Sequence, residues 1–543
     1  MFIAICRFSR AIQTLALSRR MISLKCREIF FIGNPKACLF SLNKLPVLLG
    51  KSFLPKNIDS FIAFILGFFM VLFSAPGIGL SPDSIVYLST ARNLFSHGGL
   101  NSFDGEWLTD FPAGYPVFLS LIMFITRIDF ISSGLVINGM LFGLLNVICL
   151  QQATKNGLPY YLKWLYSVLI LFSPALLHIY GMLWSETLFI FCITVFLTLS
   201  ADYGSSHEIK FLIAMALISG FICVVRYIGI TILFTGSILL LIDRSLAFRK
   251  RLAHLLIYGS IGGSFLMINL IVNRAHSTNA AGERVAAASS ILHHLSRFGE
   301  TLTSWLPIPI TVMPSFINLF SGIGFIAAAL AGIWYLLRSG KNMYGWFHLG
   351  LLFTAIYSIC LIALSTVTVF DPIDSRLLSP LYLPALGVII KAVHTAVSNG
   401  KIGLVKAIAL TLIFIVGITG FQRQYKFFVS PELVKADKYR YDFDDFGVSP
   451  TIEFIRIHPL LFRSNKNIYS NAGDLLYMFG TPDISGLPRL DSKEEMQDFI
   501  LYADYLIWLN HKYIPGDYLN KLKQKSVLKP LYSFSDGVIF TNK

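Results

Sequence analysis

Carboxylates that could do chemistry stand directly beside apolar segments in this chain. Asp83 follows the first long apolar run, in the stretch GLSPDSIVYLSTARNLFSHGGL. Asp110 lies further along, in LTDFPAGYP, and Glu186 opens another apolar run, in GMLWSETLF. A carboxylate within hydrogen-bond reach of a hydroxyl group can take its proton as a general base. These three residues are therefore the candidate acids and bases of the sequence.

Two arginines lie where they could bind an anion near those carboxylates. Arg226 interrupts the apolar stretch of residues 209–242, and Arg376 follows two aspartates in FDPIDSRLLSP. A guanidinium binds phosphate through a planar fork of donors, whereas an ammonium acts as a point charge. Arg226 could pair with Glu186 or with a lipid phosphate, and Arg376 is the alternative phosphate ligand. The simpler interpretation of each is snorkelling at a helix end.

Composition identifies the kind of protein that must position these groups. The 543 residues are 55% hydrophobic and 14% charged, with a mean hydropathy of +0.65, which is typical of a polytopic membrane protein. Basic residues on cytoplasmic loops then explain the net charge of +15, so a nucleic-acid partner is not expected. The seven cysteines show neither a disulfide framework nor a metal-binding spacing.

Apolar runs long enough to span a membrane, roughly 17 to 22 residues each, predict about eleven transmembrane helices. They begin near Phe61, Ile131, Tyr160, Met182, Ile209, Tyr227, Leu252, Phe316, Trp346, Leu377 and Gly403. One further run, GYPVFLSLIMFIT from Gly114 to Thr126, corresponds to only about 20 Å of helix. Because it is too short to cross, we interpret it as a half-helix on the outer side.

The half-helix interpretation also fixes the orientation of the chain. With it, every lysine between residues 60 and 420 falls at a cytoplasmic helix end, and the short outer loops contain arginine but no lysine. Residues 1–59 are then a basic cytoplasmic tail. The same tail could instead be a mitochondrial presequence, or an upstream extension of a chain that starts at Met21.

Two outer loops and a C-terminal domain complete the predicted organisation. A transmembrane domain over residues 60–420 contains a first outer loop at 81–130 and a long outer loop at 273–313. The long loop has the pattern of an interfacial helix, and we expect it to form a mobile cover. Residues 421–543 alternate strand-like and helix-like runs, which predicts a small extracytoplasmic α/β domain.

The order of several motifs along the chain resembles a known family. The first span is followed by PDSIVYLSTARNLFSHGGL, FPAGYPVFLSLI, SETLF, VRYIGI and SRLLSPLYLPAL. This order is similar to that of the GT-C membrane glycosyltransferases. The nearest group contains the bacterial aminoarabinose and galacturonic-acid transferases of lipopolysaccharide and the protein O-mannosyltransferases. The resemblance makes residues 60–420 a GT-C-like catalytic domain.

The resemblance implies an enzyme of the cell envelope. It would move a hexosyl or pentosyl group, with inversion, from a polyprenyl-phosphate donor to a glycolipid, lipopolysaccharide or protein acceptor. It would be a multi-pass protein of the inner (plasma) membrane, with the lipid bilayer as a partner and the active site on the extracytoplasmic face. Two alternatives stay open: a non-enzymatic transporter or flippase of lipid-linked glycans, and a ligase or polymerase of envelope polymers.

The resemblance also implies roles for individual residues. Asp83 would stand at the reacting centre, with Asp110 as a second carboxylate near the substrate and Glu186 as the acidic residue of the second outer loop. The rest of the expected substrate-binding set consists of Arg226, Arg376, Tyr87 and Tyr115. No cofactor is certain, but a divalent metal could bind to Asp110 and Glu186. The family often has two adjacent acidic residues where this chain has Asp83 and Ser84, so a metal held by that pair is in doubt.

Each carboxylate has a simpler interpretation. Asp83 could cap the helix that follows it, because aspartate is a good N-cap residue. Asp110 could start a turn before a proline, and Asp104 in FDGEW has the pattern of turn chemistry. Glu186 could simply be solvated at the start of a helix.

Overall fold

The computed structural model describes residues 58–543 apart from several gaps. The gaps are residues 76, 283–285, 288, 306–313, 370, 398–405, 407, 414, 418–439, 442–448, 463–465, 479–483, 511–516 and 543. The predicted basic tail lies outside the described residues except for its last two, which begin the first helix. The predicted domain boundary near residue 421 also lies outside them.

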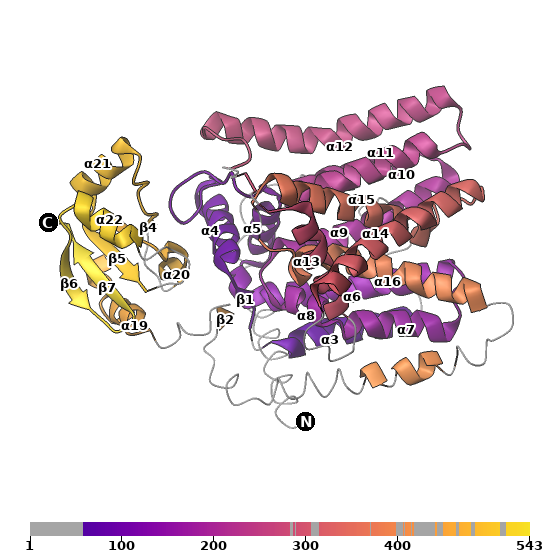
Figure 1. Ribbon diagram of the computed structural model, residues 1–543, viewed down its shortest axis with the longest axis horizontal. Coiled ribbons are helices and arrows are strands. Elements are labelled where there is room, and N and C mark those ends of the chain that lie inside the picture. The colour runs from indigo at the N-terminus through magenta and orange to yellow at the C-terminus, as the bar shows by residue number, and fades with distance from the viewer. Residues whose placement is uncertain are drawn as a thin grey trace, which may run out of the picture. The chain divides into compact units, whose positions relative to one another are not determined.

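The chain is a multi-pass membrane protein whose helices lie side by side in a bundle (Figure 1). Among the residues that the structure describes, six helices are long and apolar enough to cross a membrane. They are α6 (Phe130–Lys155), α9 (Ser185–Ser206), α12 (Phe248–His276), α14 (Ser315–Arg338), α15 (Trp346–Val367) and α16 (Ser375–Val397). Two helices bent by 50° at a short break, α7 (Tyr160–Leu171) and α8 (Pro174–Gly181), would together make a seventh span.

The other predicted spans coincide with shorter apolar helices. These are α3 (Ile58–Ser74), α10 (Ile209–Val225), the pair η2 (Tyr227–Gly229) and α11 (Ile230–Ile242), and the helical residues of Ile408–Gly417. Length and composition thus support six or seven spans in the described part of the chain, and the count of eleven stays a prediction. The short run is helix α5 (Gly114–Thr126), which has 13 residues as expected.

The break between α7 and α8 has a local cause. Pro174 lacks the N–H that would continue the helix, and it restricts the residue before it. Ser173 caps α8, because its Oγ accepts a hydrogen bond from Leu176 N at 3.3 Å. The new helix ends at Gly181, so a short connection leads directly into α9.

Helix α6 holds both helix α3 and the segment before α9. It packs closely on α3, where a Cβ on Gly67 would lie 2.9 Å from the Cα of Gly143. Further along α6, Asn138 Nδ2 donates to the carbonyls of Tyr180 and Met182, both at 2.9 Å. Helix α6 therefore holds two segments close together that are far apart in the sequence.

A short strand brings the two approaching segments together. Strand β1 (Gly79–Leu80) pairs in parallel with β2 (Arg440–Tyr441), and Gly79 also forms a parallel bridge with Met182. Leu183 N donates to Gly79 O at 2.8 Å. Because β1 leads straight into helix α4 (Pro82–His97), the first turn of α4 lies beside the first turn of α9.

The predicted long outer loop, residues 273–313, contains helix α13 (Ile291–Ser304), next to the loop that precedes α16. Thr301 Oγ1 donates to Ile373 O at 3.3 Å, and Trp305 Nε1 donates to Ser375 Oγ at 3.3 Å. The predicted helix of this loop is therefore present, and it supports the start of α16.

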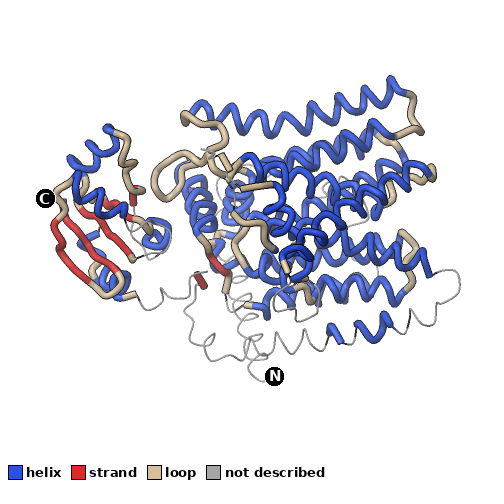
Figure 2. The backbone as a smooth tube through the Cα atoms, in the orientation of Figure 1, coloured by secondary structure: helices blue, strands red, loops and turns tan. Residues whose placement is uncertain are grey.

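The C-terminal residues contain a five-stranded mixed sheet with helices between its strands (Figure 2). The strand order is β4-β3-β5-β7-β6, with parallel pairs on one side of β5 and antiparallel pairs on the other. The strands are β3 (Ile468–Ser470), β4 (Ile484–Ser485), β5 (Tyr505–Leu509), β6 (Lys529–Ser533) and β7 (Gly537–Thr541). The helices are α19 (Pro450–Ile457), η4 (Pro459–Phe462), α20 (Gly473–Met478), α21 (Lys493–Tyr502) and α22 (Asp517–Lys525).

Both faces of the central strand β5 are buried, whereas the edge strand β6 is exposed. Along β5, Ile507 and Leu509 join one apolar cluster, while Leu506 and Trp508 join another. Successive strand residues point to opposite faces, so this alternation means that helices cover both sides.

Candidate functional site

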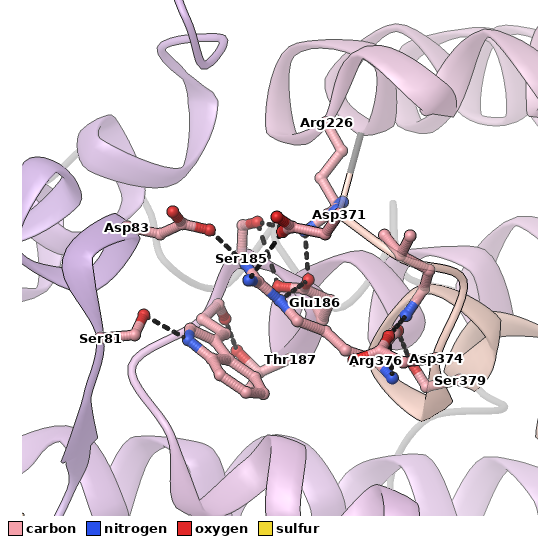
Figure 3. Close-up of polar contacts among 12 residues, drawn as sticks. Ser81, Asp83, Ser185, Glu186, Thr187, Arg226, Asp371, Asp374, Arg376 and Ser379 are labelled. Carbon is pink, nitrogen blue, oxygen red and sulfur yellow. Dashed lines mark hydrogen bonds and ion pairs between the residues drawn. The ribbon is translucent and has the colours of Figure 1, made fainter. Parts of the chain in front are cut away.

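Four charged side chains from separate helix ends meet at one place in the bundle. Asp83 lies in the first turn of α4, Glu186 in the first turn of α9 and Arg376 in the first turn of α16. Arg226 lies in the break between α10 and η2. Figure 3 shows that these side chains point toward one another. We call Asp83, Glu186, Arg226 and Arg376 the charged cluster.

Glu186 is the centre of the charged cluster. Its Oε1 accepts a hydrogen bond from Arg376 Nε and forms an ion pair with Arg226 Nη1, each at 2.5 Å. Its side chain is only 1% exposed, so the simpler interpretation of a solvated glutamate does not hold. An unpaired carboxylate at such depth would cost several kcal/mol. The two guanidinium groups remove that cost, and the glutamate in turn holds both of them in place.

Arg376 bridges the two carboxylates. While its Nε binds Glu186, its Nη2 donates to Asp83 Oδ2 at 2.6 Å. The Asp371 carboxylate lies further away, 3.9 Å from Nη1, and is largely exposed. The backbone of Arg376 is fixed as well, because its N–H donates to Asp374 Oδ1 at 2.9 Å. This arginine therefore reaches the centre of the site from a rigid helix start.

Asp83 is the acidic member of the charged cluster that substrate could reach. Its side chain is 27% exposed, and among the described residues only Arg376 is bonded to it, through Oδ2. The capping alternative is wrong, because Ser81 is the N-cap of α4 and forms a capping box with Ser84. Oδ1 of Asp83 is thus available to a hydroxyl group. It can accept a proton if an acceptor binds there.

Two of the predicted tyrosines line the inner side of the charged cluster. Tyr87 Oη lies 3.3 Å from Ser185 Oγ, which also accepts from Arg226 Nη1 at 3.0 Å. The Tyr115 ring packs edge-on against the Tyr87 ring, with centroids 5.1 Å apart. Burial raises the pKa of the Tyr87 phenol above its usual value, so it stays a neutral hydrogen-bonding group. Tyr115 is fully buried and contributes its ring.

Asp110 lies in the loop between α4 and α5, where the next residue, Phe111, packs against Tyr87 beside the charged cluster, and its role near the substrate stays a prediction. Asp110 lies on the exposed part of the first outer loop, packed against Gly282, where a Cβ would lie 2.1 Å from Asp110 Oδ1. Its charge acts on Asp104 and Glu106 in the same loop. Asp104 has the predicted turn role, because its Oδ1 accepts from Glu106 N at 3.0 Å.

The predicted metal ligands do not fit a metal ion in this arrangement. Glu186 is already paired with two arginines, and Asp110 lies in an exposed loop. Within the described part of the chain, no group of three or more His, Cys, Asp or Glu side chains is placed to hold a metal. We therefore derive no step through a metal.

Sequence reasoning missed the residues that support the charged cluster. Trp184, directly before Ser185 and Glu186, lies against Arg376, with the guanidinium carbon 4.4 Å from the ring centroid. Ser81 accepts from the Trp184 indole N–H at 2.7 Å. The sequence did contain a signal for Trp184, because an aromatic residue stands there directly before the acidic start of a predicted span. Its partners could not be found because they lie 103 residues upstream and 192 residues downstream of it in the numbering.

No protein-family model and no curated protein matches this chain, but solved structures do. ArnT from Cupriavidus metallidurans in the apo state matches with a TM-score of 0.54 at 10% identity, over 89% of this chain and 97% of that chain. The same protein bound to undecaprenyl phosphate gives a TM-score of 0.53 at 11% identity over the same shares.

A third solved structure is the archaeal oligosaccharyltransferase AglB from Archaeoglobus fulgidus, in complex with an inhibitory peptide and a dolichol-phosphate. It matches with a TM-score of 0.50 at 10% identity, over 90% of this chain and 74% of that chain. At such low identity the likeness concerns the fold. The chain shares the fold of these structures, which is the GT-C fold expected from the order of its motifs.

Proposed function

We propose that this protein is a membrane glycosyltransferase that moves a sugar from a polyprenyl-phosphate donor to an extracytoplasmic acceptor, with Asp83 as the general base. The observation that carries the proposal is the charged cluster. It combines the partly exposed carboxylate of Asp83 with two arginines that are held by the buried carboxylate of Glu186. A base and a phosphate-binding group are the two parts that this reaction needs.

The reaction follows from where these groups lie. The acceptor hydroxyl oxygen forms a bond to the anomeric carbon of the sugar, and the bond from that carbon to the phosphate oxygen breaks. Asp83 takes the hydroxyl proton through its available Oδ1, and the polyprenyl phosphate leaves with the bonding electrons. Because attack and departure take place on opposite sides of the carbon, the configuration inverts. The transferred group would be a hexosyl or pentosyl unit.

The arginines bind the phosphate in this proposal. One edge of the Arg376 guanidinium faces Asp83. Arg226 uses its Nη1 for both Ser185 and Glu186, so the other N–H donors of Arg226 can bind a ligand. Charge-assisted bonds from guanidinium to phosphate would stabilise the leaving group as its charge develops. Two of the similar structures hold undecaprenyl phosphate and a dolichol-phosphate, which supports a lipid-phosphate ligand here.

The sidedness of the charged cluster can be tested on its own. We place it on the extracytoplasmic face of the inner membrane, together with α4 and the C-terminal residues. In a variant without native cysteines, single cysteines at the exposed positions Ser96 and Gln524 should react with an impermeant thiol reagent in intact cells. A cysteine at the exposed Ser205, at the other end of α9, should not. The reverse labelling pattern would overturn this orientation.

Binding of the lipid phosphate tests the proposed function directly. Undecaprenyl phosphate added to the purified protein in detergent should raise its unfolding temperature in a saturable way, since a ligand at 100 times its Kd stabilises by about 2.7 kcal/mol. Undecaprenol, which has the same tail without the phosphate, is the matched control. Equal effects of both lipids, or no effect of either, would count against a polyprenyl-phosphate donor.

A further inference from the structure

Trp184 contacts Arg376 of the charged cluster and, through Ser81, the helix that carries Asp83. It is the N-cap residue of α9, directly before Ser185 and Glu186, and it is 4% exposed. Its own carbonyl accepts from Thr187 Oγ1 at 2.9 Å, so its backbone is fixed to the first turn of α9. A buried tryptophan at this position is held rigidly.

The indole ring supports the guanidinium of Arg376. The guanidinium carbon lies 4.4 Å from the ring centroid, within the distance at which a cation is attracted to an aromatic face. The edges of the same guanidinium bind Glu186 and Asp83. One surface of Arg376 is therefore set by an aromatic ring, and two of its edges are set by carboxylates.

The polar end of the indole reaches the helix that carries Asp83. Trp184 Nε1 donates to Ser81 Oγ at 2.7 Å, and Ser81 is the N-cap of α4, two residues before Asp83. On another side the ring meets His178 edge-on, with centroids 5.2 Å apart. Trp184 thus connects the start of α4, the start of α9 and the start of α16 through one rigid side chain.

We propose that Trp184 is a positioning residue that sets the plane of the Arg376 guanidinium and the approach of Asp83 to it. The ring gives Arg376 one orientation, and the indole N–H ties that orientation to the first turn of α4. As a role in catalysis this rests on the proposed function. The hold of Trp184 on Arg376 can be measured without any donor.

The test uses the reactivity of arginine with phenylglyoxal, followed by peptide mass spectrometry of the purified full-length protein. In Trp184→Leu, Arg376 should be modified about five times faster than in the wild type, the size expected for loss of a partly desolvated cation–π pair. Trp184→Phe keeps an aromatic face and should raise that rate only about twofold. Equal rates in the wild type and in Trp184→Leu would overturn the proposal.

Two controls separate positioning from general loosening. Arg226 shares the Glu186 anchor and has a similar exposure, 19% against 15% for Arg376, but it does not lie on Trp184. Its rate should stay the same, and an equal rise in both arginines would contradict the proposal. Trp334 stacks against Arg338 at 5.1 Å on α14, so Trp334→Leu should speed the modification of Arg338 and leave Arg376 unchanged.

The proposal stays testable if Trp184→Leu does not fold. Trp184→Phe and Ser81→Ala both lose the bond between the indole N–H and Ser81 while an aromatic ring remains, so each should raise the Arg376 rate about twofold. No change in either variant would overturn the proposal. If the rates behave as expected but the wild type does not bind undecaprenyl phosphate, the proposed function fails and the hold on Arg376 stands.

Discussion

The two ends of helix α9 carry polar clusters of different construction. At its start, Glu186 belongs to the charged cluster. At its end, about 33 Å away along a helix of 22 residues, His207 belongs to a second group. That second group consists of His207, Asp243, Ser245 and Tyr344, and we call it the far-end cluster.

The far-end cluster is saturated. Asp243 Oδ1 accepts from Ser245 Oγ at 2.5 Å and from Ser245 N at 3.0 Å, while Oδ2 bonds His207 Nε2 at 3.0 Å and Tyr344 Oη at 2.8 Å. The Asp243 side chain is 5% exposed. Burial would raise the pKa of Asp243, but these hydrogen bonds outweigh burial and lower it. Neither oxygen is left for a substrate.

The difference indicates what each cluster does. The far-end cluster joins the ends of α9 and α11 to the start of α15, and its carboxylate uses both oxygens on the protein itself. In the charged cluster, Asp83 keeps one oxygen available and the arginines keep unused donors. We therefore expect substitutions in the far-end cluster to change stability alone. Substitutions in the charged cluster should change ligand binding or turnover.

The largest effect should come from Glu186→Gln. It leaves the Arg226 guanidinium beside a neutral amide in a buried place, while Arg376 keeps Asp83, and an uncompensated buried charge costs about 3–5 kcal/mol. Chemical denaturation in detergent should show a loss of that size, together with loss of undecaprenyl phosphate binding. A variant as stable as the wild type would show that Glu186 is not the anchor of the charged cluster.

Asp243→Asn should have the next largest effect, confined to stability. The substitution weakens charge-assisted hydrogen bonds and should cost about 2 kcal/mol. Because the folded pKa of Asp243 is lowered, its contribution is present above about pH 4 and is lost as the pH falls further. The stability difference from the wild type should therefore shrink in acid. If a folded Asp243→Asn protein binds undecaprenyl phosphate more weakly than the wild type, the far-end cluster also affects ligand binding, which would contradict the difference between the two clusters.

Arg376→Lys should weaken undecaprenyl phosphate binding about tenfold, because a lysine cannot bridge two carboxylates and a phosphate with a planar fork. Arg226→Lys should weaken it less, about threefold, since Arg226 does not contact Asp83 in the described structure. Titration of purified variants measures both affinities, with Arg338→Lys on α14 as the matched control. If neither charged-cluster variant differs from that control, the arginines do not bind the phosphate.

The smallest effect should come from Asp371→Asn. The Asp371 side chain is 76% exposed and 3.9 Å from Arg376, so this pair should contribute well under about 1 kcal/mol. Undecaprenyl phosphate affinity should change by less than about twofold, in either direction, in the same titration. A tenfold change would mean that Asp371, rather than Asp83, is the carboxylate that meets the ligand.

Periodicity and length predicted much of the fold. The 13-residue helix Gly114–Thr126 was found at its expected bounds, because a short apolar run between turn signals leaves little choice. The break at Pro174 was missed because hydropathy does not register a missing N–H. Helix α9 begins at Ser185 and not near Met182, where the span was predicted to start, because residues 182 and 183 bond with Gly79.

The sequence predicted which residues form the candidate site better than it predicted the bonds between them. Asp83, Glu186, Arg226 and Arg376 were all named from their places beside apolar runs, and the structure brings them together. The pairing of Arg226 with Glu186 was one of the alternatives that the sequence offered, and the structure shows it. The bonds of Arg376 were not predictable, because Arg376 and Asp83 are 293 residues apart and meet only through helix packing. Asp110 was chosen on a motif, and its role near the substrate stays a prediction.

The most direct test of the central claim is the dependence of a cell-envelope sugar on Asp83. Cells that make the wild-type protein, no protein, or Asp83→Asn at the same level should be compared by mass spectrometry of envelope glycolipids and glycoproteins. Asp83→Asn should fold normally, because Ser81 caps α4. Turnover should fall about 100-fold or more, the usual scale for a lost general base. We predict one sugar mass that is present with the wild type and missing in the other two. The same sugar at the wild-type level in Asp83→Asn cells would contradict the account.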